Sequence, residues 1–578
     1  MENSRLAAAF DELADLLELA AESPFKTRAY RAFAERARTM HEPLSERVAR
    51  GDLGDLPGVG EAIAAKVEAF LADGTFAALE KARATVPSTL RELLKVPGLG
   101  AKSVRTLWKE AAVTTLGELV HACEENRLAT VSGFGTKKQA RTLAVARVLL
   151  EGSRGALLST ALEAGHVIGL LLRAVGAEEV VVAGEARRGL EIVKELTVLA
   201  QGIDVRVIAA ALDGAAGLGT PRVRVSRTDV TLAIHGLSTR VRAVSDEAWV
   251  HSQILETGSA AHVTWLAERA RARGLTLPGV CAGAGDEAAV YRALDLPFAP
   301  PELRAGAVDH VPEGLVARPH VRGVFHVHTD WSDGTASILE MARAAARESF
   351  EYVGISDHSC AASYANGLDA ARLREQGAAI EIARREIPGC TILHGVEVDI
   401  LPDGSLDLDN DTLASLDFVI ASVHGRFAMS YDEMTARIVR AVSHPLVTIL
   451  GHPTGRLLLG RQGYAFDVEA VARAAAANGT YLEINANPQR LDLSDALVRR
   501  AALEGAEFAI DPDAHGTVGL RDTRLGVVVA RRAGLTRDKL LNTRGRDELV
   551  AKLAARKAAA LGRLDGRRAP APDARAGL

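Results

Sequence analysis

In the C-terminal third of the chain, apolar segments that read as buried strands end repeatedly in a histidine or an acid. The pattern begins with the segment 323–328, whose last three residues are His326, Val327 and His328. Side chains two positions apart on a strand project from the same face, so both imidazoles can reach one ion. The remaining candidate metal ligands in this context are Asp333, His358, Glu397, His424, His452, Asp513 and His515.

Segments with the helical period separate these strands, for example residues 338–347, 370–385 and 468–477. Alternating strands and helices predict a parallel barrel. Because barrels carry reactive groups at the carboxyl ends of their strands, the nine side chains should meet at one mouth. Imidazole and carboxylate ligands suit zinc, manganese or iron, and this set can hold up to three ions. We interpret His394 and His444, which lie outside the set, as structural.

A short glycine turn occurs three times in residues 1–150, at 56–60, 96–100 and 131–135, each time before a helical segment. Glycine allows the tight turn, and the amides that open the next helix point outward, where a phosphate can accept their hydrogen bonds. One copy would indicate only a helix stop and start, but three copies indicate a sequence-independent grip on DNA. The candidate DNA-binding residues are Gly58, Gly60, Gly98, Gly100, Lys102, Gly133, Gly135 and Lys137.

A chain of 578 residues is too long for one hydrophobic core, which predicts a multidomain α/β protein. The net charge of −5 argues against a uniformly basic nucleic-acid binder, so contacts with DNA must be local. No apolar run reaches the roughly 20 residues that cross a bilayer, and the N-terminus reads as an amphipathic helix rather than a signal peptide. We therefore expect a cytoplasmic protein with no membrane segment. The four cysteines form no CxxC pair and are interpreted as buried packing residues.

Prolines mark the main boundary of the chain, at 296–301 and again near 312, and predict a linker over residues 301–318. The domains expected from this boundary are 1–150, 151–300 and 319–565. Residues 566–578, rich in Ala, Arg and Pro, are expected to form a disordered tail.

Residues 23–31, followed by the first glycine turn, resemble the small N-terminal domain of family X DNA polymerases. In that family the domain binds the 5′ phosphate in a gap. Lys66 falls where lyase-competent members carry their Schiff-base lysine, and Lys26 and Tyr30 match phosphate-side positions. A neighbouring basic position of those members is Ala62 here. Lyase chemistry at Lys66 is thus one hypothesis, and a solvated structural lysine is the other.

Residues 151–300 resemble the nucleotidyltransferase palm and thumb of the same family without its carboxylates. The stretch 184–191 resembles the family signature of glycine, serine, any residue and two arginines, except that Glu185 replaces the serine. Where members carry Asp-x-Asp, this chain has Glu195 and Thr197, and the third aspartate position is Arg240. Two-metal nucleotidyl transfer requires carboxylates that bridge the ions, so we predict a degenerate palm. Arg187, Arg188 and the turn 257–259 are interpreted either as remaining DNA or nucleotide contacts or as scaffold.

The nine strand-end groups resemble the ligand set of the polymerase-and-histidinol-phosphatase (PHP) domain, expected here as a distorted (β/α) barrel over 319–565. The resemblance implies three ions, held by the sets His326, His328, Glu397 and Asp513; Asp333, His358 and His515; and Glu397, His424 and His452. At such a site, a water molecule can lose its proton at neutral pH and attack a phosphate in line. Arg426, Arg456 and Arg490 are candidate catalytic residues that would hold phosphates.

A family X polymerase followed by a PHP domain is the order found in bacterial polymerase X proteins. The leading hypothesis is a monomeric DNA-repair phosphoesterase with two to three Mn²⁺ or Zn²⁺ ions, or with Mg²⁺. It would act as a 3′-5′ exonuclease or 3′-end processing enzyme on gapped, nicked or 3′-ended DNA. One alternative is an active gap-filling polymerase that uses Glu195 with an acid such as Glu191. The other is a small-molecule phosphatase similar to histidinol-phosphate phosphatase, with the N-terminal half as an interaction module.

Overall fold

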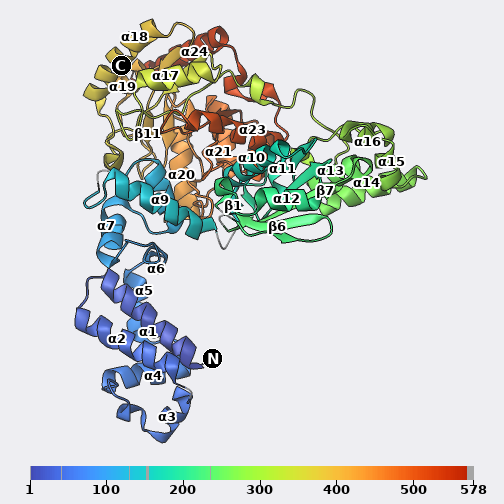
Figure 1. The fold of residues 1–578 in the computed structure, drawn as a ribbon. Helices are drawn as coiled ribbons and strands as arrows, with labels where there is room; N and C mark the ends of the chain where they lie inside the picture. The colour runs from blue at the N-terminus through green and yellow to red at the C-terminus, as the bar shows by residue number, and fades with distance from the viewer. Residues whose placement is uncertain are drawn as a thin grey trace, which may run out of the picture. The chain divides into compact units, whose positions relative to one another are not determined.

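The computed structural model describes residues 2–40, 42–128, 131–151, 155–219, 221–234 and 236–568. The chain divides into two compact units, Met1–Leu149 and Leu150–Leu578 (Figure 1). The part of the expected tail from residue 569 onward lies outside the described residues. In the described ranges, no helix is both long enough and apolar enough to span a membrane.

In the described residues of the first unit, every regular element is a helix. Its long N-terminal helix buries Leu6, Phe10 and Leu13, one face of the amphipathic pattern seen in the sequence. The helices are α1 (Glu2–Leu19), α2 (Pro24–Thr39), α3 (Leu44–Arg50), α4 (Glu61–Asp73), α5 (Ala77–Thr85), α6 (Leu90–Leu93), α7 (Ala101–Ala111), α8 (Leu116–Glu124) and α9 (Thr136–Glu151).

The three glycine turns share one backbone conformation. The first glycine of each turn is left-handed, with φ of 82° at Gly58, 89° at Gly98 and 78° at Gly133. An added Cβ would meet no atom within 4 Å at any of them, so the backbone angle requires glycine and close packing does not. The helices α4, α7 and α9 begin directly after the second glycine of each turn, as the sequence predicts.

The second unit begins with a mixed α/β layer. Its five-stranded sheet has the order β2-β4-β7-β6-β5, and only β4 and β7 run parallel. Helices α10 and α12 pack on this sheet through Ile168, Leu172, Ile208 and Leu212. The elements are α10 (Leu158–Ala174), β2 (Val180–Ala183), α11 (Gly184–Arg187), β4 (Glu195–Gln201), α12 (Val205–Leu212), β5 (Arg224–Val225), β6 (Asp229–Ile234) and β7 (Leu237–Val244), with the short pair β1 (Ala156–Leu157) and β3 (Ile192–Val193).

Four short helices follow the sheet and pack around Leu266, Val290 and Tyr291. They are α13 (Trp249–Thr257), α14 (Ala260–Ala272), α15 (Leu277–Ala282) and α16 (Glu287–Ala293).

The rest of the unit is a parallel barrel. A three-stranded sheet has the order β10-β9-β8 and a five-stranded sheet the order β11-β12-β13-β14-β15. The sheets join because β11 follows β10 directly, and because the amide of His328 donates to Ala514 O at 2.9 Å beyond β8 and β15. The strands are β8 (Gly323–Val324), β9 (Tyr352–Ile355), β10 (Thr391–His394), β11 (Glu397–Asp399), β12 (Ile420–Ser422), β13 (Ile449–Leu450), β14 (Tyr481–Asn485) and β15 (Phe508–Asp511).

A helix follows every barrel strand except β10, and the three helices that the sequence predicts are present. They are α17 (Ile338–Arg347), α18 (Ala370–Glu386), α19 (Asn410–Ser415), α20 (Tyr431–Val442), α21 (Val468–Asn478), α22 (Asp495–Leu503), α23 (Thr523–Arg532) and α24 (Arg546–Arg568). The distorted (β/α) barrel expected for this region is confirmed.

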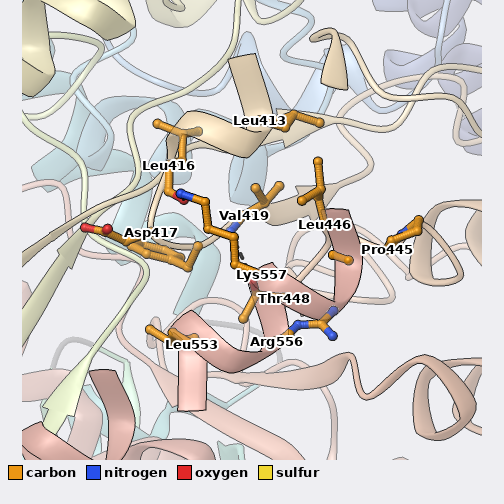
Figure 2. Close-up of a pocket in the computed structure, with 12 residues that line it drawn as sticks. Leu413, Leu416, Asp417, Val419, Pro445, Leu446, Thr448, Leu553, Arg556 and Lys557 are labelled. Atoms are coloured by element: carbon orange, nitrogen blue, oxygen red, sulfur yellow. Dashed lines mark hydrogen bonds between the residues drawn. The ribbon is translucent and has the colours of Figure 1, made fainter. Parts of the chain in front are cut away.

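The amino-terminal end of the barrel is closed by α24. Its Leu549 and Leu553 join a buried cluster with Phe325, Phe418 and Ile449 inside the barrel. Figure 2 shows residues of α24 and of the neighbouring barrel segments that line a small pocket, where Lys557 donates to Leu416 O at 2.9 Å. This end of a barrel contributes to stability, since the reactive groups gather at the other end.

The segment 301–318 is irregular, as expected for a linker, but it is packed against the rest of the unit. Arg304 is completely buried and its Nη1 lies 2.5 Å from Glu287 Oε1. Val316 is also buried, and Glu302 forms an ion pair with Arg531 at 2.7 Å. The predicted linker thus lies against both of its neighbours, while the domain boundary itself stays a prediction. The α/β layer and the barrel contribute to one continuous apolar core.

Gly189 tests how closely these two parts are packed. Its φ is 70°, and a Cβ would lie 2.0 Å from Val528 Cγ1 on α23. Gly189→Ala should lower the Tm measured by scanning calorimetry, with a steric cost of about 1–3 kcal/mol because valine is stiff on a helix. Gly214→Ala is the control, since φ is 68° there and the added Cβ meets nothing within 4 Å. Equal Tm values for the two variants would contradict the close packing.

Candidate metal centre

The nine predicted ligands meet at the carboxyl ends of the barrel strands. Their ligand atoms form four groups in which all atoms lie within 4.8 Å of one another. The groups are His328, Asp333, His358 and His515; His326, His328 and Asp513; His326, Glu397 and His452; and His358, Glu397 and His424.

The backbone places most of the ligands just beyond a strand end. His326 and His328 follow β8, His358 follows β9, His424 follows β12, His452 follows β13, and Asp513 and His515 follow β15. Glu397 lies after β10 at the start of β11, and Asp333 lies in the turn before α17. Two ligands sit in left-handed backbone, with φ of 24° at His452 and 51° at Asp513. Such conformations are costly for residues other than glycine, and they cluster at functional sites.

Glu397 is the centre of the cluster. Its Oε1 lies 2.9 Å from Nε2 of His452, 3.2 Å from Nε2 of His424 and 3.3 Å from Nε2 of His326. Its Oε2 lies 2.9 Å from Nδ1 of His358. One carboxylate thus reaches two of the groups, and it can bridge cations held in both.

Several buried polar atoms of the cluster lack a hydrogen-bond partner. In the described part of the chain, Nε2 of His326, both ring nitrogens of His328, Oδ2 of Asp333 and Oε2 of Glu397 are buried without a hydrogen-bond partner. Buried polar atoms without partners are rare because each costs about 1–3 kcal/mol. Lone pairs that converge in this way fit divalent cations, so the residues present match the metal site that the sequence predicts.

The electrostatics keep several ligands in the form that binds metal. Burial by itself raises the pKa of Glu397, but the imidazoles of His424 and His326 lower that pKa well below its usual value. Burial, with Arg490 nearby, lowers the pKa of His452 to about 3. Burial opposes protonation of His326 too, yet the surrounding carboxylates raise its pKa well above the usual value. Metal binding at His326 would therefore release a proton.

Two carboxylates that the sequence analysis missed orient the ligands. Nδ1 of His326 lies 2.6 Å from Oε1 of Glu483 on β14, and Nδ1 of His424 lies 2.6 Å from Oδ1 of Asp399 on β11. A carboxylate behind an imidazole fixes the ring and leaves Nε2 for the metal. The signal for Glu483 was present, because Tyr481 to Asn485 alternates apolar and polar residues as a strand does.

The three predicted arginines occupy different positions. Nε of Arg490 lies 3.3 Å from Oδ2 of the ligand Asp513. Arg426 is exposed two residues after His424, in left-handed backbone with φ of 61°. The guanidinium of Arg456 is instead occupied, because it donates to backbone oxygens and to Oε1 of Glu191 at 2.5 Å. The predicted phosphate contact of Arg456 is therefore not supported.

The palm positions that lack carboxylates lie side by side. Thr197 on β4 pairs in register with Arg240 on β7. The Arg240 guanidinium forms ion pairs with Glu195 at 3.2 Å and with Glu256 at 2.8 Å, and it lies 3.3 Å from Oγ1 of Thr197. At two positions where the resemblance places metal-binding aspartates, the chain thus carries a threonine and an arginine whose charge is already paired, and the degenerate palm stays a prediction.

The remaining basic residues that the sequence singles out lie in the palm and in the helical unit. Arg187 binds Glu287 at 2.6 Å and Arg188 binds Thr257 O at 2.8 Å, which supports the scaffold interpretation. Nζ of Lys66 donates to Ala62 O at 2.7 Å, and lyase chemistry there stays a prediction. Lys102 and Lys137 are exposed after their turns, as DNA contacts require.

The cysteines follow the expected interpretation with one exception. Cys123, Cys281 and Cys390 are buried, but Cys360 is exposed. The prediction of a buried packing role was wrong for Cys360.

His328→Ala should strongly reduce metal binding, because the completely buried His328 belongs to two of the four groups. Metal content after loading with Mn²⁺ or Zn²⁺ and dialysis, measured by mass spectrometry, is the readout. His310→Ala is the control, since His310 is exposed and lies outside these groups. Unchanged metal content in His328→Ala would contradict the assignment.

Comparison with known protein families gives matches in the N-terminal and the C-terminal part of the chain. Residues 1–76 match a helix-hairpin-helix domain, residues 90–146 match a SAM-like helix-hairpin-helix tandem, and residues 325–487 match the PHP domain. These matches imply DNA binding by the helical part and divalent-metal binding by the barrel.

Whole-chain similarity extends these matches across the palm. A protein of Thermoanaerobacter sp. (strain X514) named "Probable phosphatase" is 32% identical over 38% of this chain and 89% of its own length. The "DNA polymerase/3'-5' exonuclease PolX" of Bacillus subtilis (strain 168) is 32% identical over 94% of this chain and 98% of its own length. The resemblance to family X polymerases with a C-terminal PHP domain is thereby confirmed. The chain belongs to the same family as Bacillus subtilis PolX.

Proposed function

We propose that this protein is a metal-dependent phosphoesterase that removes nucleotides or blocking groups from the 3′ ends of DNA. The buried cluster of nine ligands around Glu397 carries the proposal, because it is the site in which convergent lone pairs are left for cations. The helix-hairpin-helix matches supply a means of holding DNA, and the name of the Bacillus subtilis relative includes a 3′-5′ exonuclease.

The protein's own groups would prepare the site for hydrolysis. Cations held there lower the pKa of water and withdraw charge from a phosphate ester. Glu483 and Asp399 keep the imidazoles of His326 and His424 turned toward the cluster. Arg490 and Arg426 remain our candidates for binding the phosphate oxygens of the substrate.

We propose Mn²⁺ or Zn²⁺ as the bound ions, two to three of them, with Mg²⁺ as a poorer substitute. Six of the nine ligands are imidazoles. Imidazole ligands suit zinc and the carboxylates of the cluster suit manganese, whereas Mg²⁺ prefers an all-oxygen shell and retains its own water.

We further propose that gapped, nicked or 3′-ended DNA is the substrate and that the protein acts as a monomer in repair. The three left-handed glycine turns expose helix N-termini to the phosphate backbone, a contact that ignores base sequence. Such a grip suits an enzyme that must act at ends of any sequence.

A small-molecule phosphatase is a second candidate function. Two relatives named as probable phosphatases match 38% and 33% of this chain, and 89% and 74% of their own lengths. Failure of the full chain to bind gapped DNA at low salt would favour this candidate over a DNA enzyme.

Digestion of 3′-end-labelled and 5′-end-labelled DNA tests the leading proposal. With added Mn²⁺ or Zn²⁺, we expect the 3′ label to be released first. Asp513→Asn should slow release by about 100-fold or more, since even a residue behind a metal ligand typically contributes 10- to 100-fold. Asp432→Asn is the control, because Asp432 is exposed at the start of α20. Digestion that survives in Asp513→Asn would overturn the proposal.

Primer extension on a gapped duplex tests the polymerase alternative. Glu195 is paired with Arg240, and Glu191 is paired with Arg456. Neither acid is available to bridge two metal ions, so we expect no template-directed addition by the wild type or by His328→Ala. Addition that follows the template and persists in His328→Ala would show an active palm.

A further inference from the structure

Glu191 of the palm forms an ion pair with Arg456 of the barrel across 265 positions of sequence. Oε1 of Glu191 lies 2.5 Å from Nη2 of Arg456, and the two side chains are only 22% and 16% exposed. An ion pair sheltered to this degree is screened less by water and salt than a surface pair. The position of Glu191 therefore affects the position of the Arg456 guanidinium and of the other groups that this guanidinium binds.

Arg456 ties together two segments that reach the metal cluster. Its Nε donates to Arg490 O at 2.9 Å and its Nη2 to Leu491 O. The first segment, 452–456, begins with the metal ligand His452. The second, 489–492, carries Arg490, whose Nε lies 3.3 Å from Oδ2 of the ligand Asp513.

A further bond joins the same two segments. The amide of Thr454 donates to Oδ2 of the fully buried Asp492 at 3.0 Å. Both ligands served by these segments, His452 and Asp513, have left-handed backbone, which persists only where the surroundings enforce it. The contacts of Arg456 help to hold the backbone at His452 and Asp513 in this conformation.

The palm segment that carries Glu191 is itself held against the barrel. Nη1 of Arg532 on α23 donates to Arg188 O at 2.9 Å, and Gly189 packs against Val528 of the same helix. The segment that carries Glu191 is thus fixed against α23. The next two residues, Ile192 and Val193, form β3, which pairs with β1 of the palm.

We propose that Glu191 is a positioning residue through which the palm sets the metal affinity of the PHP site. The Glu191–Arg456 pair holds segments 452–456 and 489–492 in the geometry that places His452 and Asp513 around the cations. This deepens the proposed function and rests on it only for the reaction that the metals serve. It gives the degenerate palm a role that needs no polymerase chemistry.

Mn²⁺ affinity of the full-length protein is the test, measured by the electron paramagnetic resonance signal of free Mn²⁺. Glu191→Gln keeps the size of the side chain and removes its charge. We expect about tenfold weaker Mn²⁺ binding, the lower end of the effect seen for residues behind metal ligands. Glu185→Gln is the matched control, since Glu185 lies in the same palm segment but accepts from Lys194 N at 2.7 Å. Affinity within twofold of the wild type in Glu191→Gln, or an equal loss in Glu185→Gln, would overturn the proposal.

A double-variant comparison separates positioning from general destabilisation. If Glu191 acts through Arg456, then Glu191→Gln should weaken Mn²⁺ binding in the wild-type background and change it less than twofold in Arg456→Ala. Additive losses in the double variant would mean that Glu191 acts by another route and would overturn the proposal. Circular dichroism melting of each variant checks that the fold is retained.

Hydrolysis of bis(p-nitrophenyl) phosphate extends the test to a substrate too small to contact the palm. Glu191→Gln should require about tenfold more Mn²⁺ for half-maximal hydrolysis, with little change in rate at saturating Mn²⁺. A loss confined to DNA substrates would overturn positioning in favour of a DNA contact. If the wild type binds Mn²⁺ but leaves DNA intact, the proposed function fails, while the Mn²⁺ affinities still decide the role of Glu191.

Discussion

A carboxylate surrounded by imidazoles and almost removed from water is the constraint on which this structure depends. Glu397 is 1% exposed and touches four histidines, and such a concentration of ionisable groups is costly unless partners or cations compensate it. The barrel offsets this cost because its strands hold the groups in place and because Glu483 and Asp399 pair with Nδ1 of His326 and His424. The fixed side chains direct the lone pairs of their ligand atoms toward shared points, and the binding of several cations requires this arrangement.

The same chain shows the opposite outcome at its palm. There, Glu195 and Glu256 are paired with Arg240, so the acids that remain are neutralised by a guanidinium. Arginine keeps its charge at any ordinary pH, so these acids remain paired with a cation of the chain itself. The strand register that places Thr197 against Arg240 holds a salt-bridge network. One fold therefore carries a site open to cations and a second site closed by its own cation.

Much of this arrangement was predictable because it follows from local periodicity. The helices over 338–347 and after each glycine turn were expected from spacing, and so were the nine ligands after their strands. Glu483 was missed although its strand has a visible pattern, because its partner His326 lies 157 positions away and only the closed barrel brings the two together. The packed state of 301–318 was missed for a related reason, since Arg304 is buried only through Glu287, a residue of another element.

The amino-acid sequence by itself determined which residues can ligate metal, where the backbone must turn left-handed at glycine, and which palm carboxylates are missing. The ligands and the turns follow from residue type and short-range spacing, and the missing carboxylates follow from the resemblance to family X polymerases. None of these inferences needs knowledge of distant contacts. Only the tertiary structure decided how the ligands group around Glu397, which acids orient them, and that Arg456 binds Glu191 rather than standing free. The reason is physical: these outcomes depend on distances between segments far apart in the chain, and the closed barrel and its packing against the palm set those distances.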